Sequence, residues 1–185
     1  SLIGHTYYHN FVTHLREADG PSGTALITVA ASGENTIILD AGANATVSVE
    51  PAKASLFPAP SDIVVLQAEI PERANAEALA WAHSFGARVL LNLAPARPTD
   101  PALMARTDIL VVNETEAGLT LGMPAPAGPM EAIGVARALR GLGPKHVMVT
   151  LGADGAAWAS GSEAGHCPAL TLGEAVDTTG AGDAC

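Results

Sequence analysis

The stretch DILVVNETEAGLTL, residues 108–121, sets the fold class because it joins a strand pattern directly to a helix pattern. After Asp108 the residues Ile-Leu-Val-Val form a short continuous apolar run, which is typical of a strand in a parallel sheet. From about Glu114 to Leu121 the chain favours a helix, with acidic residues in its first turn. A strand followed at once by a helix is the repeating unit of an α/β sheet.

The same alternation recurs on both sides of this stretch. We expect DIVVL at residues 62–66 to be a strand buried on both faces, as in the interior of a parallel sheet. The other expected elements are a helix at 72–85, a strand at 88–91, a helix at 130–142 that ends at Gly143-Pro144, a strand at 146–150 and short β segments within 155–177. The pattern predicts a mostly parallel sheet flanked by helices, with right-handed crossovers.

The chain before residue 61 has a different pattern. Two β-rich runs, residues 24–31 and 36–40, are separated by a turn at 32–35, which predicts a β-hairpin. A short helix is expected at residues 7–18. We therefore expect an N-terminal part (1–60) that carries the hairpin (24–40) and an α/β core (61–185). Since no linker separates the two parts, we expect one domain overall.

Composition excludes several classes of protein. Of 185 residues, 48% are hydrophobic and 15% charged, which argues against a disordered chain. The net charge of −10 argues against a nucleic-acid-binding surface. The sequence has no apolar run long enough to span a membrane, and its two cysteines lack metal-ligand spacing. The first ten residues hold His and Tyr in place of a basic run and an apolar block, so we expect no signal peptide. A cytoplasmic location is expected.

Three polar clusters follow predicted strands: residues 67–71, 113–116 and 150–155. Parallel strands end at one edge of the sheet, and ligands bind at that edge in open α/β sheets. Three clusters at one edge are much less probable by chance than one. We therefore expect a shared binding site there.

The most informative motif is DTTGAGD, residues 177–183. Its small residues let the backbone approach a ligand, and a helix starting here would present free N–H groups to an anion. Asp183 could accept the proton of a substrate hydroxyl. On spacing alone, a Gly-rich turn with Asp183 as a helix cap is equally acceptable.

Two further motifs lie at the expected edge. Asn113 and Glu116 are three residues apart at a helix start, so an amide and a carboxylate face one side and could organise hydrated Mg²⁺. Taken alone, they are better explained as a helix N-cap. Residues 150–155 (TLGADG) offer a hydroxyl and two glycines that leave room for a nucleotide, or they form a tight turn.

DTTGAGD and VVNETEA together resemble the signatures of the ribokinase-like (PfkB) family of carbohydrate kinases. The resemblance implies a ribokinase-like sandwich with a small β-hairpin lid, and transfer of the γ-phosphoryl group from ATP to a sugar hydroxyl. It implies that Asp183 is the catalytic base and that Gly180, Ala181 and Gly182 form the anion hole. The ATP-binding residues it implies are Asn113, Thr150, Leu151, Gly152, Ala153, Asp154, Gly155, Gly182 and Asp183. The implied metal ligands are Asn113 and Glu116 for Mg²⁺, and Asp177 and Thr179 for a monovalent cation such as K⁺.

Three more segments are similar to members of the family that phosphorylate ribose. LQAEIP (66–71) resembles a strand end with a substrate-contacting glutamate, which makes Glu69 and Asp183 the implied substrate-binding residues; a plain surface acid is the alternative for Glu69. NLAPA (92–96) and LDAGAN (39–44) resemble family segments after a strand and after the lid. Ribose is the favoured acceptor, with fructose, 2-keto-3-deoxygluconate or a nucleoside as alternatives. The lid strands could form a homodimer.

The resemblance covers roughly residues 23–183 and lacks two family regions. Nothing in residues 1–22 resembles the substrate segment at the family's N-terminus, and only two residues follow Asp183. We therefore expect an incomplete fold that is weakly active or inactive by itself, because an anion hole needs a fixed first helical turn. The alternative is a non-catalytic remnant that binds nucleotide or a partner chain.

Overall fold

The computed structural model describes residues 18–29 and 35–170 of the chain. It divides into two compact units, Ser1–Leu56 and Phe57–Cys185, and each is described by itself. The helix expected at residues 7–18 lies, except for its last residue, outside the described residues. The Gly-rich motif at 177–183 and the residues 30–34 around the expected hairpin turn also lie outside them.

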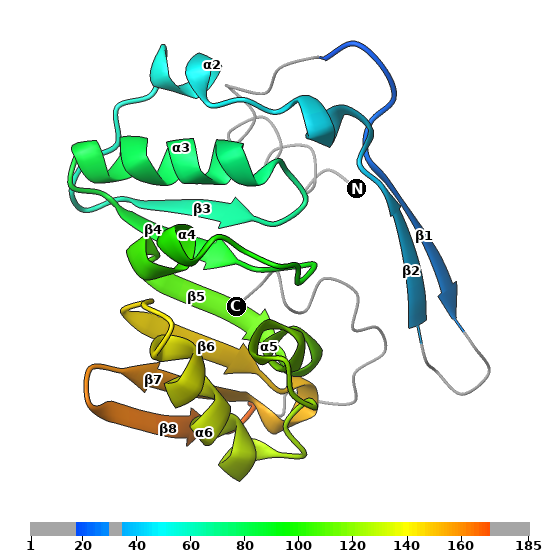
Figure 1. Cartoon of the computed structure of the whole chain (residues 1–185), viewed down its shortest axis with the longest axis vertical. Helices are drawn as coiled ribbons and strands as arrows, with labels where there is room; N and C mark the ends of the chain where they lie inside the picture. The colour runs from blue at the N-terminus through cyan, green and yellow to red at the C-terminus, as the bar shows by residue number, and fades with distance from the viewer. Residues whose placement is uncertain (1–17, 30–34, 171–185) are drawn as a thin grey trace. The chain divides into compact units, whose positions relative to one another are not determined.

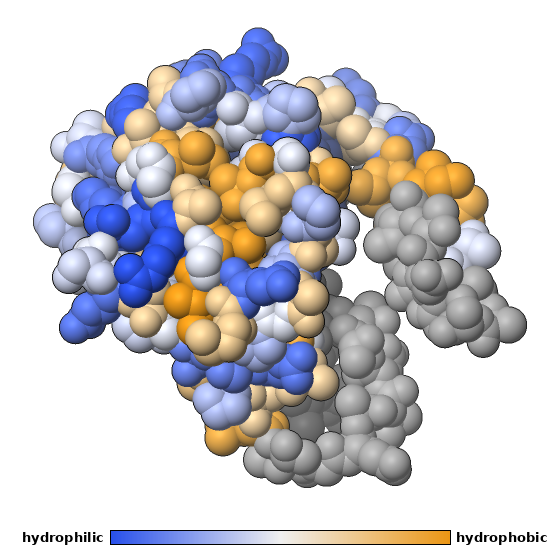
Figure 2. Space-filling model, turned by 60° about the horizontal axis from the view of Figure 1, so that its bottom comes forward, coloured by the Kyte–Doolittle hydropathy of each residue, from blue (hydrophilic) through white to orange (hydrophobic). Residues whose placement is uncertain are grey.

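In the first unit, the two strands of the expected hairpin are confirmed. β1 (Thr24–Val29) pairs antiparallel with β2 (Asn35–Asp40), and η1 (Gly42–Thr46) and α2 (Glu50–Lys53) follow. Leu26 lies opposite Ile38, and these two side chains are 61% and 62% exposed. Apolar side chains on the hairpin are orange in Figure 2. A two-stranded sheet with such exposure is marginally stable at best by itself.

The second unit is built on a six-stranded sheet with the strand order β3-β4-β5-β6-β7-β8 (Figure 1). The first four strands are parallel and the last two pairings are antiparallel, so the expected α/β class with a mostly parallel sheet is confirmed. The strands are β3 (Ile63–Gln67), β4 (Arg88–Asn92), β5 (Ile109–Asn113), β6 (His146–Thr150), β7 (Ala156–Ser160) and β8 (Glu163–Cys167).

The helices of this unit bury one face of the sheet. α3 (Glu72–Ser84) contacts β3 and β4, α5 (Glu114–Leu121) contacts β5 and β6, and α6 (Pro129–Arg140) contacts β6, β7 and β8. Because side chains alternate between the faces of a strand, every second residue enters this core. The core residues from the central strands are Val89, Leu91, Leu110, Val112, Val147 and Val149, all at most 2% exposed.

The expectation that residues 62–66 are buried on both faces is wrong. β3 is the edge strand of the sheet, and Ile63 and Val65 are 41% and 68% exposed. Leu66, on the opposite face, is buried. The face of β3 that carries Ile63 and Val65 is therefore exposed in the described part of the chain. The sequence shows that this strand suits burial, but not whether a layer covers it.

Two α-helices of the described residues, α2 and α4, were not expected from the sequence. α4 (Pro101–Arg106) begins after Asp100, whose Oδ1 accepts a hydrogen bond from the Ala102 N–H at 2.8 Å. Asp-Pro at a helix start is a recognised capping signal, because proline at the first turn needs no hydrogen bond. α6 starts at Pro129 and ends at Arg140, two residues before the expected end at 142.

Candidate functional site

Polar side chains lie at the carboxyl ends of the four parallel strands. Gln67 at the end of β3 pairs with Asn92 at the end of β4, and Asn113 at the end of β5 pairs with Thr150 at the end of β6. The sheet thus brings the three predicted clusters to one edge. This is the edge at which open α/β sheets bind ligands.

Asn113 and Glu116 form a reciprocal capping box at the start of α5. Asn113 Oδ1 accepts from the Glu116 N–H at 2.8 Å, and Glu116 Oε2 accepts from the Asn113 N–H at 2.8 Å. The capping interpretation of these residues is therefore correct. Within the described residues, the box leaves the Asn113 amide nitrogen and Glu116 Oε1 for a ligand. Capping and ligand binding are thus compatible.

The surroundings of Glu116 raise the pKa of its carboxyl group. Burial raises the pKa of its carboxyl, and the hydrogen bond from the Asn113 backbone acts in the opposite direction. A nearby cation would favour the ionised form of such a group. In the described ranges, no group of three or more His, Cys, Asp or Glu side chains could hold a metal ion. A Mg²⁺ ion here would therefore depend on few protein ligands, as is usual for Mg²⁺ bound with phosphates.

The segment after β6 turns tightly beside Asn113. Gly152 starts the short helix η2 (Gly152–Asp154) with φ 53°, and a Cβ atom added there would meet nothing within 4 Å. Gly155 has φ 89°, and a Cβ atom there would overlap the Cys167 carbonyl oxygen. Gly155 is therefore required by packing against β8. At Gly152, by contrast, the space beside the backbone is open, as the sequence leads us to expect for a nucleotide.

Glu69 lies on an exposed loop that several hydrogen bonds hold in place. Its backbone N–H bonds to the side chain of Gln67, and the Gln67 carbonyl accepts from Asn75 Nδ2 at 2.9 Å. Arg97 Nη2 donates to the Ile70 carbonyl at 3.0 Å. The sequence did not predict the roles of Asn75 and Arg97. Asn75 is 1% exposed. The available signal in the sequence was an amide four residues before Leu79, on the same side of the expected helix, because a buried amide needs hydrogen-bond partners.

A carboxylate with a lowered pKa lies at the opposite end of the parallel strands, where their amino ends meet. Asp108 precedes β5 and is 2% exposed. Burial raises its pKa, but hydrogen bonds from Lys145 (2.7 Å), His83 (2.8 Å) and the Val89 N–H (2.8 Å) together lower it to about 2. Asp108 lies at the amino ends of the strands, away from the candidate site, and both of its carboxylate oxygens accept hydrogen bonds. Its role is structural, because these bonds join α3, β4 and the start of β6.

The predicted catalytic and cation-binding residues lie outside the described residues. They are Asp177, Thr179, Gly180, Ala181, Gly182 and Asp183. Their roles stay predictions. The structure does describe the strand that precedes them. β8 ends at Cys167, which pairs with Ala156, and Ala156 in turn pairs with Thr150. The chain therefore leaves β8 at the same edge as Asn113.

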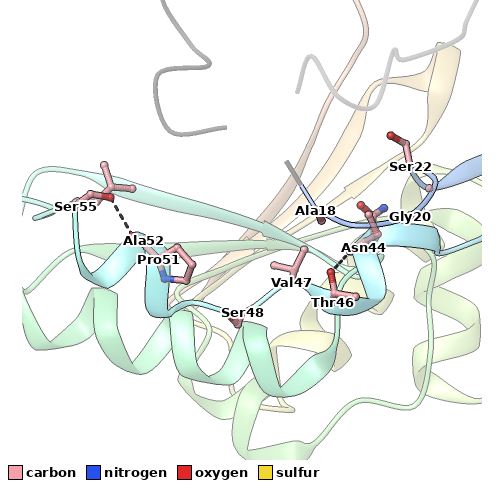
Figure 3. A pocket seen from close by; sticks show the side chains of 13 residues that line it. Ala18, Gly20, Ser22, Asn44, Thr46, Val47, Ser48, Pro51, Ala52 and Ser55 are labelled. Atoms are coloured by element: carbon pink, nitrogen blue, oxygen red, sulfur yellow. Dashed lines mark hydrogen bonds between the residues drawn. The ribbon is translucent and has the colours of Figure 1, made fainter. Parts of the chain in front are cut away.

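The first unit contains a cavity of about 830 Å³ (Figure 3). Its lining includes Ser22, Asn44, Thr46 and Ser55. Thr46 Oγ1 donates to the Ala43 carbonyl at 2.8 Å and Ser55 Oγ donates to the Pro51 carbonyl at 3.0 Å, so neither hydroxyl proton is available to a ligand. Among the described residues, no charged side chain and none of the predicted site residues lines this cavity.

Comparison with known proteins identifies the family. Residues 10–185 match the pfkB family of carbohydrate kinases. The chain belongs to this family. It is 37% identical over 172 residues to a ribokinase of Staphylococcus aureus, a match that covers 91% of this chain and 55% of that protein. It is 36% identical over 165 residues to a deoxyribokinase of Salmonella typhi, covering 88% of this chain and 53% of that protein.

Solved pfkB-family structures have the same fold. The Arabidopsis thaliana ribokinase, solved with ribose and ATP, matches with a TM-score of 0.73 and 31% identity over 89% of this chain and 54% of that chain. The ribokinase-like fold with its small antiparallel sheet is confirmed. The chain spans about half the length of these relatives, so the fold is incomplete relative to them. No helix in the described ranges has the length and hydropathy to cross a membrane.

Proposed function

We propose that this chain forms the nucleotide-binding part of an ATP-dependent sugar kinase that converts ribose to ribose 5-phosphate. One observation carries the proposal: β5 and β6 end side by side with Asn113 opposite Thr150, and β8 returns the chain to that edge. Asp177 is ten residues beyond Cys167. Ten residues can span up to about 33 Å, so the Gly-rich motif can reach the ends of β5 and β6.

In this proposal the Gly-rich motif performs the chemistry. Asp183 takes the proton from the attacking sugar hydroxyl, and the backbone N–H groups of residues 180–182 stabilise charge on the γ-phosphoryl group. Asp177 and the Thr179 carbonyl hold a monovalent cation such as K⁺ beside the motif. These roles rest on the motif itself and on family membership.

The nucleotide phosphates lie, in this proposal, over the start of α5. Asn113 and Glu116 hold hydrated Mg²⁺ there, and the atoms that their capping box leaves free suit a water-mediated contact. When bound, Mg²⁺ neutralises phosphate charge. The N-terminus of α5 also favours anions. Residues 150–155 line the ribose and adenine of ATP, and the open space at Gly152 supports this position.

The acceptor sugar contacts Glu69 and Asp183. The exposed Glu69 carboxylate stands on a loop that is anchored at both ends, which suits a residue that must meet a ligand in one orientation. Similarity to a ribokinase and to a deoxyribokinase favours a pentose. Fructose, 2-keto-3-deoxygluconate and nucleosides are the acceptors to compare with ribose and deoxyribose.

A second candidate is a nucleotide-binding remnant without turnover. The uncovered face of β3 favours it, because Val65 is 68% exposed where a complete kinase domain would need a packed sheet. In this case the isolated chain binds ATP but phosphorylates no sugar. Transfer of labelled phosphate from ATP to ribose separates the two candidates, and Asp183→Asn is the control that removes the proposed base.

The decisive experiment is calorimetric titration of the 185-residue chain with ATP, with and without Mg²⁺. Glu116→Gln keeps the capping box, since glutamine accepts the same backbone bond, but removes the charge. We expect this variant to keep its melting temperature and lose most of the Mg²⁺-dependent gain in ATP affinity. Failure of the unmodified chain to bind ATP would contradict the proposal.

We also propose that the hairpin forms a homodimer and that the protein is cytoplasmic. Leu26 and Ile38 form an exposed apolar pair across β1 and β2, and a second hairpin could cover them. Sedimentation of the unmodified chain and of a Leu26→Ser, Ile38→Ser variant tests the dimer. A monomer at all protein concentrations would exclude it.

A further inference from the structure

A second cavity lies in the unit Phe57–Cys185, among residues that the proposed kinase reaction does not use. Its volume is about 600 Å³, which is within the usual range for small-molecule sites. The loop after β4, the start of α4 and the end of α5 form its walls, together with Leu142, which follows α6. The lining includes Arg97, Thr99, Met104, Leu119, Thr120 and Leu142.

Arg97 is the charged residue of this lining, and its guanidinium is only partly bonded. Nη2 donates to the Ile70 carbonyl, while Nε is buried without a hydrogen-bond partner among the described residues. No carboxylate in the described part of the chain forms an ion pair with Arg97. A guanidinium carries five N–H donors and always a positive charge, and the Nη protons that the Ile70 carbonyl does not use give this cavity wall spare capacity for an anion.

The hydroxyl groups of the lining have no free proton to donate to an anion. Thr99 Oγ1 donates to the Arg97 carbonyl at 3.0 Å, and Thr120 Oγ1 donates to the Glu116 carbonyl at 2.7 Å. Both protons are therefore engaged, and the hydroxyls can only accept. Arg97 is left as the side-chain donor that can select a ligand by charge.

The remaining wall is apolar. Met104 is 3% exposed and forms part of the core, while Leu119 and Leu142 are 66% and 44% exposed. Exposed leucines beside a cavity gain by contact with an apolar ligand. A free inorganic anion would leave these apolar side chains in contact with water, so the wall favours an anion that carries a hydrocarbon chain.

We propose that this cavity binds a small aliphatic carboxylate, with the carboxylate on Arg97 and the hydrocarbon chain against Met104, Leu119 and Leu142. The same guanidinium holds the Ile70 carbonyl in the loop that carries Glu69. Binding therefore changes the loop that orients Glu69. This consequence for the sugar site rests on the proposed function, whereas the binding site itself does not.

The test is titration of the chain with butanoate, hexanoate and octanoate, followed by calorimetry and by amide NMR. Affinity should rise about fourfold for each methylene group until the cavity is full. Hexylamine and hexanol, of matched length, should bind much more weakly. Arg97→Gln should weaken hexanoate binding at least about tenfold, because it removes a charge-assisted hydrogen bond. Arg106→Gln, on α4 but outside the lining, should leave the affinity unchanged.

A second variant guards against misfolding of the first. Leu119→Glu places a negative charge at an exposed wall position and should abolish hexanoate binding without changing the melting temperature. Equal affinity for hexylamine, or no saturable binding of octanoate at millimolar concentration, would overturn the site. Saturable binding that leaves the Glu69 and Ile70 amide resonances unmoved would overturn the link to the loop. No ATP enters these measurements, so their outcome is separate from that of the kinase proposal.

Discussion

Replacing Asp108 by asparagine should remove a large part of the stability of the unit Phe57–Cys185. The carboxylate is 2% exposed and bonds to Lys145, His83 and the Val89 N–H. Its pKa falls from 3.8 to about 2. A difference of one pKa unit corresponds to about 1.4 kcal/mol, so the ionised form contributes roughly 2 kcal/mol to the free energy of unfolding at neutral pH.

The pH dependence follows from the direction of this shift. Because the folded-state pKa is lowered, the contribution is fully present above pH about 4 and is lost as pH falls toward about 2. Asp108→Asn should therefore unfold at lower urea concentration than the parent at pH 7, and the difference should shrink toward pH 2. Trp81 and Trp158 both lie in this unit, so tryptophan fluorescence reports its unfolding.

A matched control is Glu77→Gln, which neutralises an exposed carboxylate on α3. Surface changes of this kind alter stability by about 0.5 kcal/mol or less. If Asp108→Asn were as stable as Glu77→Gln at pH 7, or if its destabilisation were the same at pH 7 and at low pH, the three hydrogen bonds would not stabilise the ionised carboxylate as argued.

Three other predictions can be checked by thermal or urea denaturation. Gly143→Ala should destabilise by about 1–3 kcal/mol, because φ is 125° and the new Cβ would lie 2.4 Å from the Ala105 Cα, whereas Gly134→Ala, in open space on α6, should stabilise by about 0.5–1 kcal/mol; equal effects would refute this. Asp100→Ala should cost about 1 kcal/mol by removing the cap of α4, and Asp100→Ser should restore most of it. Val65→Lys should leave stability nearly unchanged and reduce aggregation measured by light scattering, and a severe loss of stability would show that Val65 is covered.

The sequence predicts the four parallel strands well because each is a short apolar run, and helix signals directly follow two of them, β3 and β5. It does not predict which strand is at the edge. Val65 and Val111 look alike in the sequence, yet Val65 is 68% exposed and Val111 is 6% exposed. The difference depends on neighbouring layers, which local patterns do not encode. α4 was missed because Asp100-Pro101 suits a turn as well as a helix start.

The candidate site was predicted in part, because several of its residues lie at the ends of strands that the sequence indicates. Asn113 and Thr150 are the last residues of their strands and Glu69 lies just beyond the end of β3, so their common position at the carboxyl ends of the strands could be inferred from the chain order. The supporting contacts could not, because they join residues far apart in the sequence. Arg97 reaches Ile70 across 27 positions and Lys145 reaches Asp108 across 37. No periodic pattern connects such pairs before the chain is folded.

The capping box at α5 has a consequence for interpreting altered copies of this domain. Asn113 and Glu116 begin a helix whether or not a nucleotide is ever bound, since their two backbone bonds need no ligand. A descendant gene that no longer encoded a working enzyme would still lose folding stability on changing either residue. Persistence of N-x-x-E in such a gene product would therefore reflect selection for a folded chain, and would be poor proof of retained catalysis.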